Sequence, residues 1–117
     1  MQTSAQRQAM RAYAAAADAR PARAQEAELF RGVGAALRRA AQRDGVARSR
    51  ALADNERLWT MVIDLLRDPA NALPEGLRAS IISVGLAVQR EMRSTTPDFG
   101  FLVAVNENIA AGLDRAG

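Results

Sequence analysis

Apolar residues recur at three- and four-residue steps on both sides of a proline-containing stretch in the middle of the chain. The apolar positions of residues 51–67 fall on one side of a 3.6-residue helix, and those of residues 75–93 do the same. Pro69 biases Asp68 away from helical backbone angles, whereas Pro74 suits the first turn of a new helix because its missing N–H would be unpaired there. The pattern therefore predicts two apolar helices joined by a stiff elbow.

Two more helices are predicted before this pair. The first spans residues 4–18, with Ser4 as its N-cap and a thin face of alanine and one tyrosine, so we expect it to dock loosely or to depend on a partner. Pro21 interrupts the pattern, and the second helix follows over residues 23–43. A short polar connection through residues 44–50 then leads to the elbow helices.

A last helix is predicted near the end of the sequence, with Thr96 as its N-cap and Pro97 at its first position. Runs of alternating β-branched residues with tight hairpin turns are absent, which argues against a β-rich fold. The sequence therefore predicts an all-α protein, a compact bundle of four to five helices that forms a single domain over residues 1–117.

Composition narrows the possible chemistry. The chain has no cysteine and no histidine, which excludes disulfides, zinc sites built on those residues and nucleophile–histidine pairs. We therefore expect a protein that is not an enzyme and that uses no cofactor or metal. All 16 basic residues are arginine, but the net charge is only +3, so charge says little about partners. Because no secretory signal and no membrane-spanning stretch of about 20 apolar residues is visible, the expected location is the cytoplasm.

Few polar residues suggest a site. Asp64 and Asp68 are four residues apart and form the one arrangement resembling a carboxylate pair, which we interpret as surface charge at a helix end. Asn55 and Asn106 fall on apolar stripes, so their amides must find partners, and we expect each to fix helix register by bonding a backbone group or the elbow; a ligand role is the alternative. Trp59 is the single indole, and we favour a core position over a binding position.

The most basic stretch of the chain allows two interpretations. One is an RNA-binding patch, and the other is a solvated surface. No aromatic residue lies between these arginines to stack on bases, which favours the solvated surface. The residues concerned are Arg38, Arg39, Arg43, Arg48 and Arg50.

The sequence resembles the flagellar biosynthesis regulator FlaF of alphaproteobacteria over nearly its whole length. The most specific part is Asn55-x-x-Leu58-Trp59, then Asp64, then Pro69-x-Asn71-x-Leu73-Pro74-x-x-Leu77-Arg78-Ala79-x-Ile81-Ile82-Ser83. Weaker agreement includes Tyr13, Leu29-Phe30 and Asn106. The sequence departs from the family pattern at Ala87, where a second Trp is expected, and at Gly34, where Thr is usual.

The resemblance implies a non-enzymatic role in flagellum assembly. The family promotes flagellin production or export together with the regulator FlbT, and a role as a cytoplasmic chaperone that binds flagellin is the leading hypothesis. Flagellin termini are helical and apolar on one side, so a helical bundle with spare apolar surface suits them. The alternative is a regulator that contacts flagellin mRNA through the arginine-rich stretch or acts on it with FlbT. Candidate protein-binding or signature residues are Asn55, Trp59, Asn71, Leu73, Pro74, Arg78 and Asn106.

Overall fold

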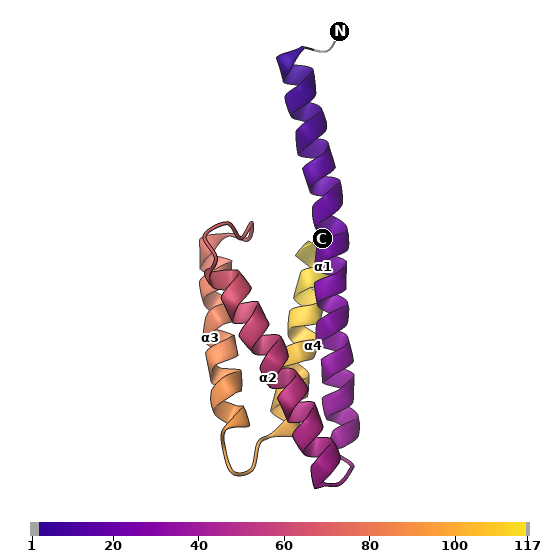
Figure 1. The fold of residues 1–117 in the computed structure, drawn as a ribbon, viewed down its shortest axis with the longest axis vertical. Coiled ribbons are helices and arrows are strands. Elements are labelled where there is room, and N and C mark those ends of the chain that lie inside the picture. The colour runs from indigo at the N-terminus through magenta and orange to yellow at the C-terminus, as the bar shows by residue number, and fades with distance from the viewer. Residues whose placement is uncertain (1–2, 117) are drawn as a thin grey trace.

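The computed structural model describes residues 3–116, with the side chains of residues 12–22 and 116 left outside the description. These residues form four α helices and no strand, which confirms the predicted all-α fold (Figure 1). The helices are α1 (Ser4–Ala40), α2 (Gly45–Arg67), α3 (Glu75–Met92) and α4 (Phe99–Ala116).

The four helices form two antiparallel pairs. α4 runs back along the second half of α1, and α3 runs back along α2 (Figure 1). α2 starts beside the end of α1 and diverges from α1 and α4 as it approaches the elbow, so the pairs open toward that end of the molecule. α1 has 37 residues and α4 has 18, lengths of about 55 and 27 Å at 1.5 Å per residue, so the first turns of α1 extend beyond α4.

The predicted elbow is present. α2 ends at Arg67, and Asp68 has an extended backbone with ψ of 124° because the following residue is proline. α3 begins at Glu75, whose carboxylate lies in the first turn of the helix, where the helix dipole favours negative charge. Pro74 is the N-cap residue of α3 instead of a residue of its first turn, and its carbonyl accepts a hydrogen bond from Arg78 N at 2.9 Å.

The break predicted at Pro21 is wrong, because α1 is one continuous helix from Ser4 to Ala40. A proline inside a helix removes one backbone hydrogen bond and costs about 3 kcal/mol, which does not by itself end a helix. Alanine, the strongest helix former, dominates the sequence on both sides of Pro21 and favours continuation. The N-cap is Thr3 and not Ser4: Thr3 Oγ1 accepts from Gln6 N at 3.1 Å, and Gln6 Oε1 accepts from Thr3 N at 2.8 Å.

Two other helix starts also differ from the prediction. α2 begins at Gly45, so residues 45–50 are helical instead of a polar connection; Asp44 Oδ1 accepts from Ala47 N at 3.1 Å and caps the helix. α4 begins at Phe99, and Asp98 Oδ1 accepts from Phe101 N at 3.1 Å, the contact that was expected of Thr96. In both cases the aspartate places a negative charge at the positive end of the helix dipole.

The core lies between the two helix pairs and is centred on Trp59. The indole is fully buried, which confirms its predicted core position. The ring of Phe30 from α1 meets it edge to face, with centroids 5.4 Å apart and planes at 70°. Around them pack apolar side chains from all four helices, including Leu37, Leu58, Val88, Leu102 and Leu113.

Candidate functional site

Three buried polar side chains join α2 to α4 in the middle of the core. Asn106 Nδ2 donates to Asn55 Oδ1 at 2.8 Å, and Trp59 Nε1 donates to Asn106 Oδ1 at 3.0 Å. We call Asn55, Trp59 and Asn106 the core polar network. All three side chains are fully buried, so each hydrogen bond forms where water cannot replace it.

The network confirms the prediction that both asparagines are buried and satisfied, but it corrects their partners. We expected bonds to the backbone or to the elbow, whereas the two amides bond each other, between residues of α2 and α4 that are 51 positions apart in sequence. Asn55 Nδ2 also donates to Met92 Sδ at 3.2 Å, which brings the end of α3 to the same point. Sliding any of these helices by one turn would break the bonds, so the network fixes their register.

Close approach of α3 to Trp59 requires a glycine. A Cβ added at Gly85 would lie 2.8 Å from Trp59 Cε3 and 3.0 Å from Ile63 Cδ1, both closer than van der Waals contact. The space at Gly34 of α1 is less restricted, because a Cβ added there would lie 3.4 Å from the Cβ of Asn106, which is close to ordinary contact. Trp59 of α2 therefore lies where all four helices meet, since Phe30, Gly85 and Asn106 of the other three helices all contact it.

The elbow has its own hydrogen-bond network, built by Asn71 and Arg78. Asn71 Nδ2 donates to Leu65 O and its Oδ1 accepts from Leu73 N, both at 3.0 Å. Arg78 Nη1 donates to Leu66 O and Asp68 O, each at 3.3 Å, and so satisfies carbonyl groups at the end of α2. The Nε–H of Arg78 is buried without a hydrogen-bond partner. These bonds hold residues 71–73 against α2.

An apolar groove opens beside the elbow, at the end where the two helix pairs diverge. It encloses about 200 Å³, and α1, α2, α3, α4 and the elbow all contribute to its lining. Twelve of its fifteen lining residues are apolar, and the exceptions are Arg23, Glu26 and Asn71. We call this the elbow groove. The apolar lining residues are Leu29, Phe30, Leu58, Met61, Val62, Leu65, Leu66, Ala72, Leu73, Ile81, Ile109 and Leu113.

The rim of the elbow groove exposes large apolar side chains to solvent. Leu29 is 49% exposed, Met61 43% and Leu65 49%, whereas Phe30 and Leu58 below them are buried. Exposed apolar side chains gathered around a concave surface are typical of a site that receives another molecule. The groove is suited to bind a row of apolar side chains of a partner, and it has few groups that can form hydrogen bonds to a ligand.

The predicted site residues fall into two groups around this groove. Asn71 and Leu73 line it, and Pro74 and Arg78 shape the elbow that forms one of its walls. The core polar network lies inside the bundle and has no exposed surface, so it acts on the groove only by fixing the helices around it. Sequence reasoning missed the rim residues, since a surplus of apolar residues per helix turn indicates a spare surface without locating it.

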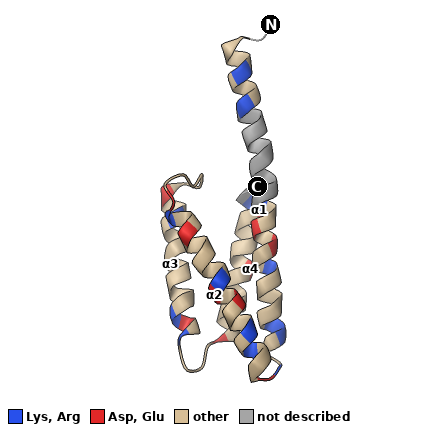
Figure 2. Ribbon diagram, viewed as in Figure 1, with Lys and Arg blue, Asp and Glu red and all other residues tan. Residues whose placement is uncertain are grey.

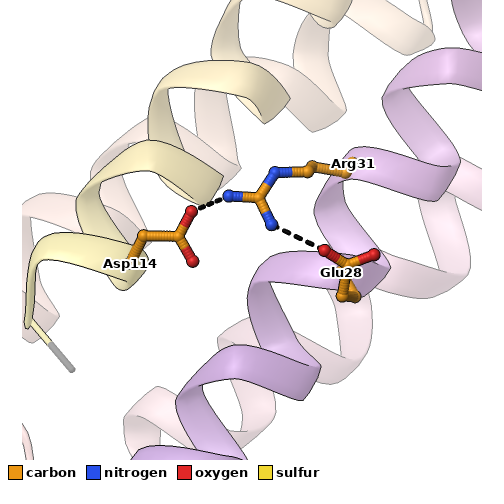
Figure 3. A network of polar contacts seen from close by, with 3 residues as sticks. All are labelled: Glu28, Arg31 and Asp114. Carbon is orange, nitrogen blue, oxygen red and sulfur yellow. Dashed lines mark hydrogen bonds and ion pairs between the residues drawn. The ribbon is translucent and has the colours of Figure 1, made fainter.

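Arginines form several contacts within the bundle. Arg31 of α1 pairs with Glu28 at 2.7 Å and also with Asp114 of α4 (Figure 3). Arg38 pairs with Glu107, which gives a second link between the same helices. Arg48 donates to Ala41 O at 2.8 Å and lies over the Phe99 ring, 5.3 Å from its centroid. Two of the five arginines of the basic stretch, Arg38 and Arg48, are thus engaged in intramolecular contacts.

Asp64 and Asp68 are exposed, in agreement with their interpretation as surface charge, and Asp68 Oδ1 accepts from Ala70 N at 2.9 Å. Within the described residues, acidic side chains form no group of three that is able to hold a metal ion. No helix in the same part of the chain has the length and apolar character that a membrane crossing requires.

The sequence matches a family of known proteins. The model of a family described as flagellar protein FlaF matches residues 9–113, which include the elbow, the groove and the core polar network. No curated protein and no solved structure matches the chain.

Proposed function

This chain belongs to the FlaF family of flagellar proteins, and from that premise we propose that it promotes flagellin synthesis and export by binding a helical segment of flagellin. In this proposal the chain acts in the cytoplasm as a secretion chaperone, without catalysis and without a cofactor, alongside an FlbT-like regulator. The bound segment lies in the elbow groove and places its apolar face against the groove lining.

The observation that carries this proposal is the composition of the elbow groove. Its floor consists of buried aromatic and aliphatic side chains, and its rim consists of Leu29, Met61 and Leu65, which are nearly half exposed in the free protein. An amphipathic helix that covers this rim removes apolar surface from water on both partners, at about 25 cal/mol per Å². The same surface has few hydrogen-bonding groups, so it supports helix binding better than recognition of a polar ligand.

A matched pair of substitutions tests the proposal. Leu65 lies on the rim of the groove, and Leu86 on α3 is 42% exposed but does not line it. Leu65→Glu should weaken binding of labelled flagellin at least tenfold, because a charge would be buried in the complex. Leu86→Glu should bind like the parent. Fluorescence anisotropy measures both affinities, and urea unfolding checks that both variants fold. Equal binding by the two variants would refute the groove as the binding site.

Direct regulation of flagellin mRNA through the arginine-rich stretch is the competing proposal. Arg38 and Arg48 already contact other groups of the protein, which lowers the number of guanidinium groups oriented toward a ligand. RNA binding through arginine–phosphate contacts would weaken steeply as salt rises, whereas apolar contacts in the groove respond far less. If the purified protein bound the flagellin leader RNA tightly and ignored flagellin, the chaperone proposal would be refuted.

A further inference from the structure

The net positive charge of the chain is concentrated at its beginning. Four arginines and one aspartate lie in residues 1–25, so this segment alone accounts for the net charge of +3, and residues 26–117 are balanced. Figure 2 shows arginine and no acidic residue on the first turns of α1. The arginines are Arg7, Arg11, Arg20 and Arg23, and the aspartate is Asp18.

These first turns are helical although they are exposed to solvent. We call residues 3–11 the N-terminal arm; every one of them is exposed, and they lie beyond the end of α4 (Figure 1). The reciprocal hydrogen bonds of Thr3 and Gln6 cap the helix and satisfy two backbone groups at its start. The arm therefore presents its side chains in a fixed helical arrangement before any partner is bound, which lowers the entropy lost on binding.

The arm belongs to the same helix as one wall of the elbow groove, because α1 runs without a break from Ser4 to Ala40. Leu29, on the rim, is eighteen residues after Arg11, which is five full turns at 3.6 residues per turn, so both residues lie on the same face of α1. Arg7 lies one further turn along that face. At 1.5 Å per residue, Arg11 and Arg7 are about 27 and 33 Å from Leu29 along the helix axis. A rod lying in the groove and leaving it along α1 passes both guanidinium groups.

We propose that the partner is a helical segment with two chemically different parts, an apolar part held in the elbow groove and an acidic part held along the N-terminal arm. This inference rests on the proposed function and specifies the chemistry of the bound segment. Because both helices rise 1.5 Å per residue, the acidic residues stand about 18 to 22 positions from the apolar anchors. Opposite charges there set the direction in which the segment lies in the groove.

A second copy of this chain fits the surface less well. Two arms carry the same charge and repel each other, and the neutral remainder of the chain offers no acidic excess to attract an arm. The described residues of the arm include no aromatic side chain on which a nucleic-acid base could stack, which disfavours single-stranded RNA. Charge and continuity with the groove together favour an acidic helix.

Charge reversal on the arm tests the inference. The double variant Arg7→Glu with Arg11→Glu should bind flagellin about tenfold more weakly, because two exposed attractions become repulsions. The control double variant Arg90→Glu with Arg93→Glu changes the same charge at exposed positions of the α3 end and should bind like the parent. Unchanged binding by the arm variant would refute the inference. If Leu65→Glu still lost binding in that case, the proposed function would survive without it, whereas failure of the parent to bind flagellin would refute both.

A crosslinking experiment identifies what lies beside the arm. Gln8 is exposed between the two arginines, and a photo-crosslinking residue placed there reports on neighbours within a few ångströms. In the complex with flagellin, mass spectrometry should find crosslinks to a segment rich in Asp and Glu, about 18 to 22 residues from the segment that contacts position 65. The inference would be overturned by crosslinks to a second copy of this chain or to basic flagellin segments. It would also be overturned if, in a separate competition experiment, leader RNA displaced flagellin only when Arg7 and Arg11 are present.

Discussion

Replacing Asn106 with leucine tests whether the core polar network is needed for stability. Leucine has the same number and branching of side-chain heavy atoms as asparagine but no hydrogen-bonding group, so the substitution removes both bonds of Asn106 without leaving a cavity. Trp59 Nε1–H and Asn55 Oδ1 then stay in the core without partners. Each unpaired buried group costs about 1–3 kcal/mol, and the new apolar side chain returns about 1–2 kcal/mol. We expect the free energy of unfolding to fall by about 2–4 kcal/mol, a large part of the 5–15 kcal/mol typical of a domain.

The double variant distinguishes a coupled network from two independent polar residues. Asn55→Leu alone leaves the Nδ2 group of Asn106 unpaired, whereas Asn55→Leu with Asn106→Leu leaves only the indole N–H of Trp59 unpaired. The double variant should therefore be more stable than the sum of the single losses predicts, by about 1–3 kcal/mol. A network that acts as a unit gives this result, and two independent polar residues do not.

Urea unfolding measures these free energies directly. Trp59 is the single tryptophan and lies inside the network, so its fluorescence follows loss of the local packing, and far-ultraviolet circular dichroism follows the helices. Coincident transitions by the two methods would justify a two-state treatment, and a constant slope with urea would show that only stability has changed. A loss below about 0.5 kcal/mol for Asn106→Leu, which is the size of a typical surface substitution, would show that the network adds little stability. Strictly additive losses would show that the two asparagines act independently.

The remaining predictions concern packing and the arm. Gly85→Ala should lower the unfolding free energy by about 1–2 kcal/mol, since the clash with Trp59 outweighs the gain in helix propensity. A Cβ added at Gly32 meets nothing within 4 Å, so Gly32→Ala should raise the unfolding free energy by about 0.5–1 kcal/mol. Urea midpoints that shift in the same direction for the Gly85 and Gly32 variants would contradict this contrast. Trp59→Ala should cost about 3–5 kcal/mol, measured by circular dichroism; a parental melting curve would disprove its core role. Thr3→Ala should speed amide exchange in residues 6–11 without moving the global midpoint, because the arm buries no side chain; a lowered midpoint would show that the arm stabilises the bundle.

The elbow was predictable because prolines restrict the backbone locally. Pro69 acts on Asp68, the residue before it, and Pro74 has a fixed φ that fits the start of α3, so neither effect depends on distant contacts. Pro21 shows the limit of the same rule. A single proline costs a few kcal/mol, and whether the helix continues depends on the helix propensity of the neighbouring residues. The prediction of a break at Pro21 gave the alanines around it too little weight.

The candidate site was predictable only in part. Asn55 and Asn106 could be recognised as buried because they interrupt apolar stripes, but their pairing depends on how α2 and α4 cross, which local periodicity does not contain. The same limit applies to the elbow groove. Leu29 and Leu65 come from different helices, and they border one groove because the two helix pairs diverge at the elbow end.

The separation of charge along the molecule affects its behaviour in concentrated solution. The molecule is 65 Å long, and its excess charge lies within the first 25 residues, whereas electrostatic repulsion at physiological salt fades over about 8 Å. Two molecules whose arms point away from each other can therefore bring their neutral bodies together with little repulsion, although the formal charge suggests otherwise. Proteolytic removal of the first 25 residues would leave a fragment whose formal charges cancel at neutral pH. Because proteins are least soluble where their net charge is zero, this fragment should be least soluble near neutral pH.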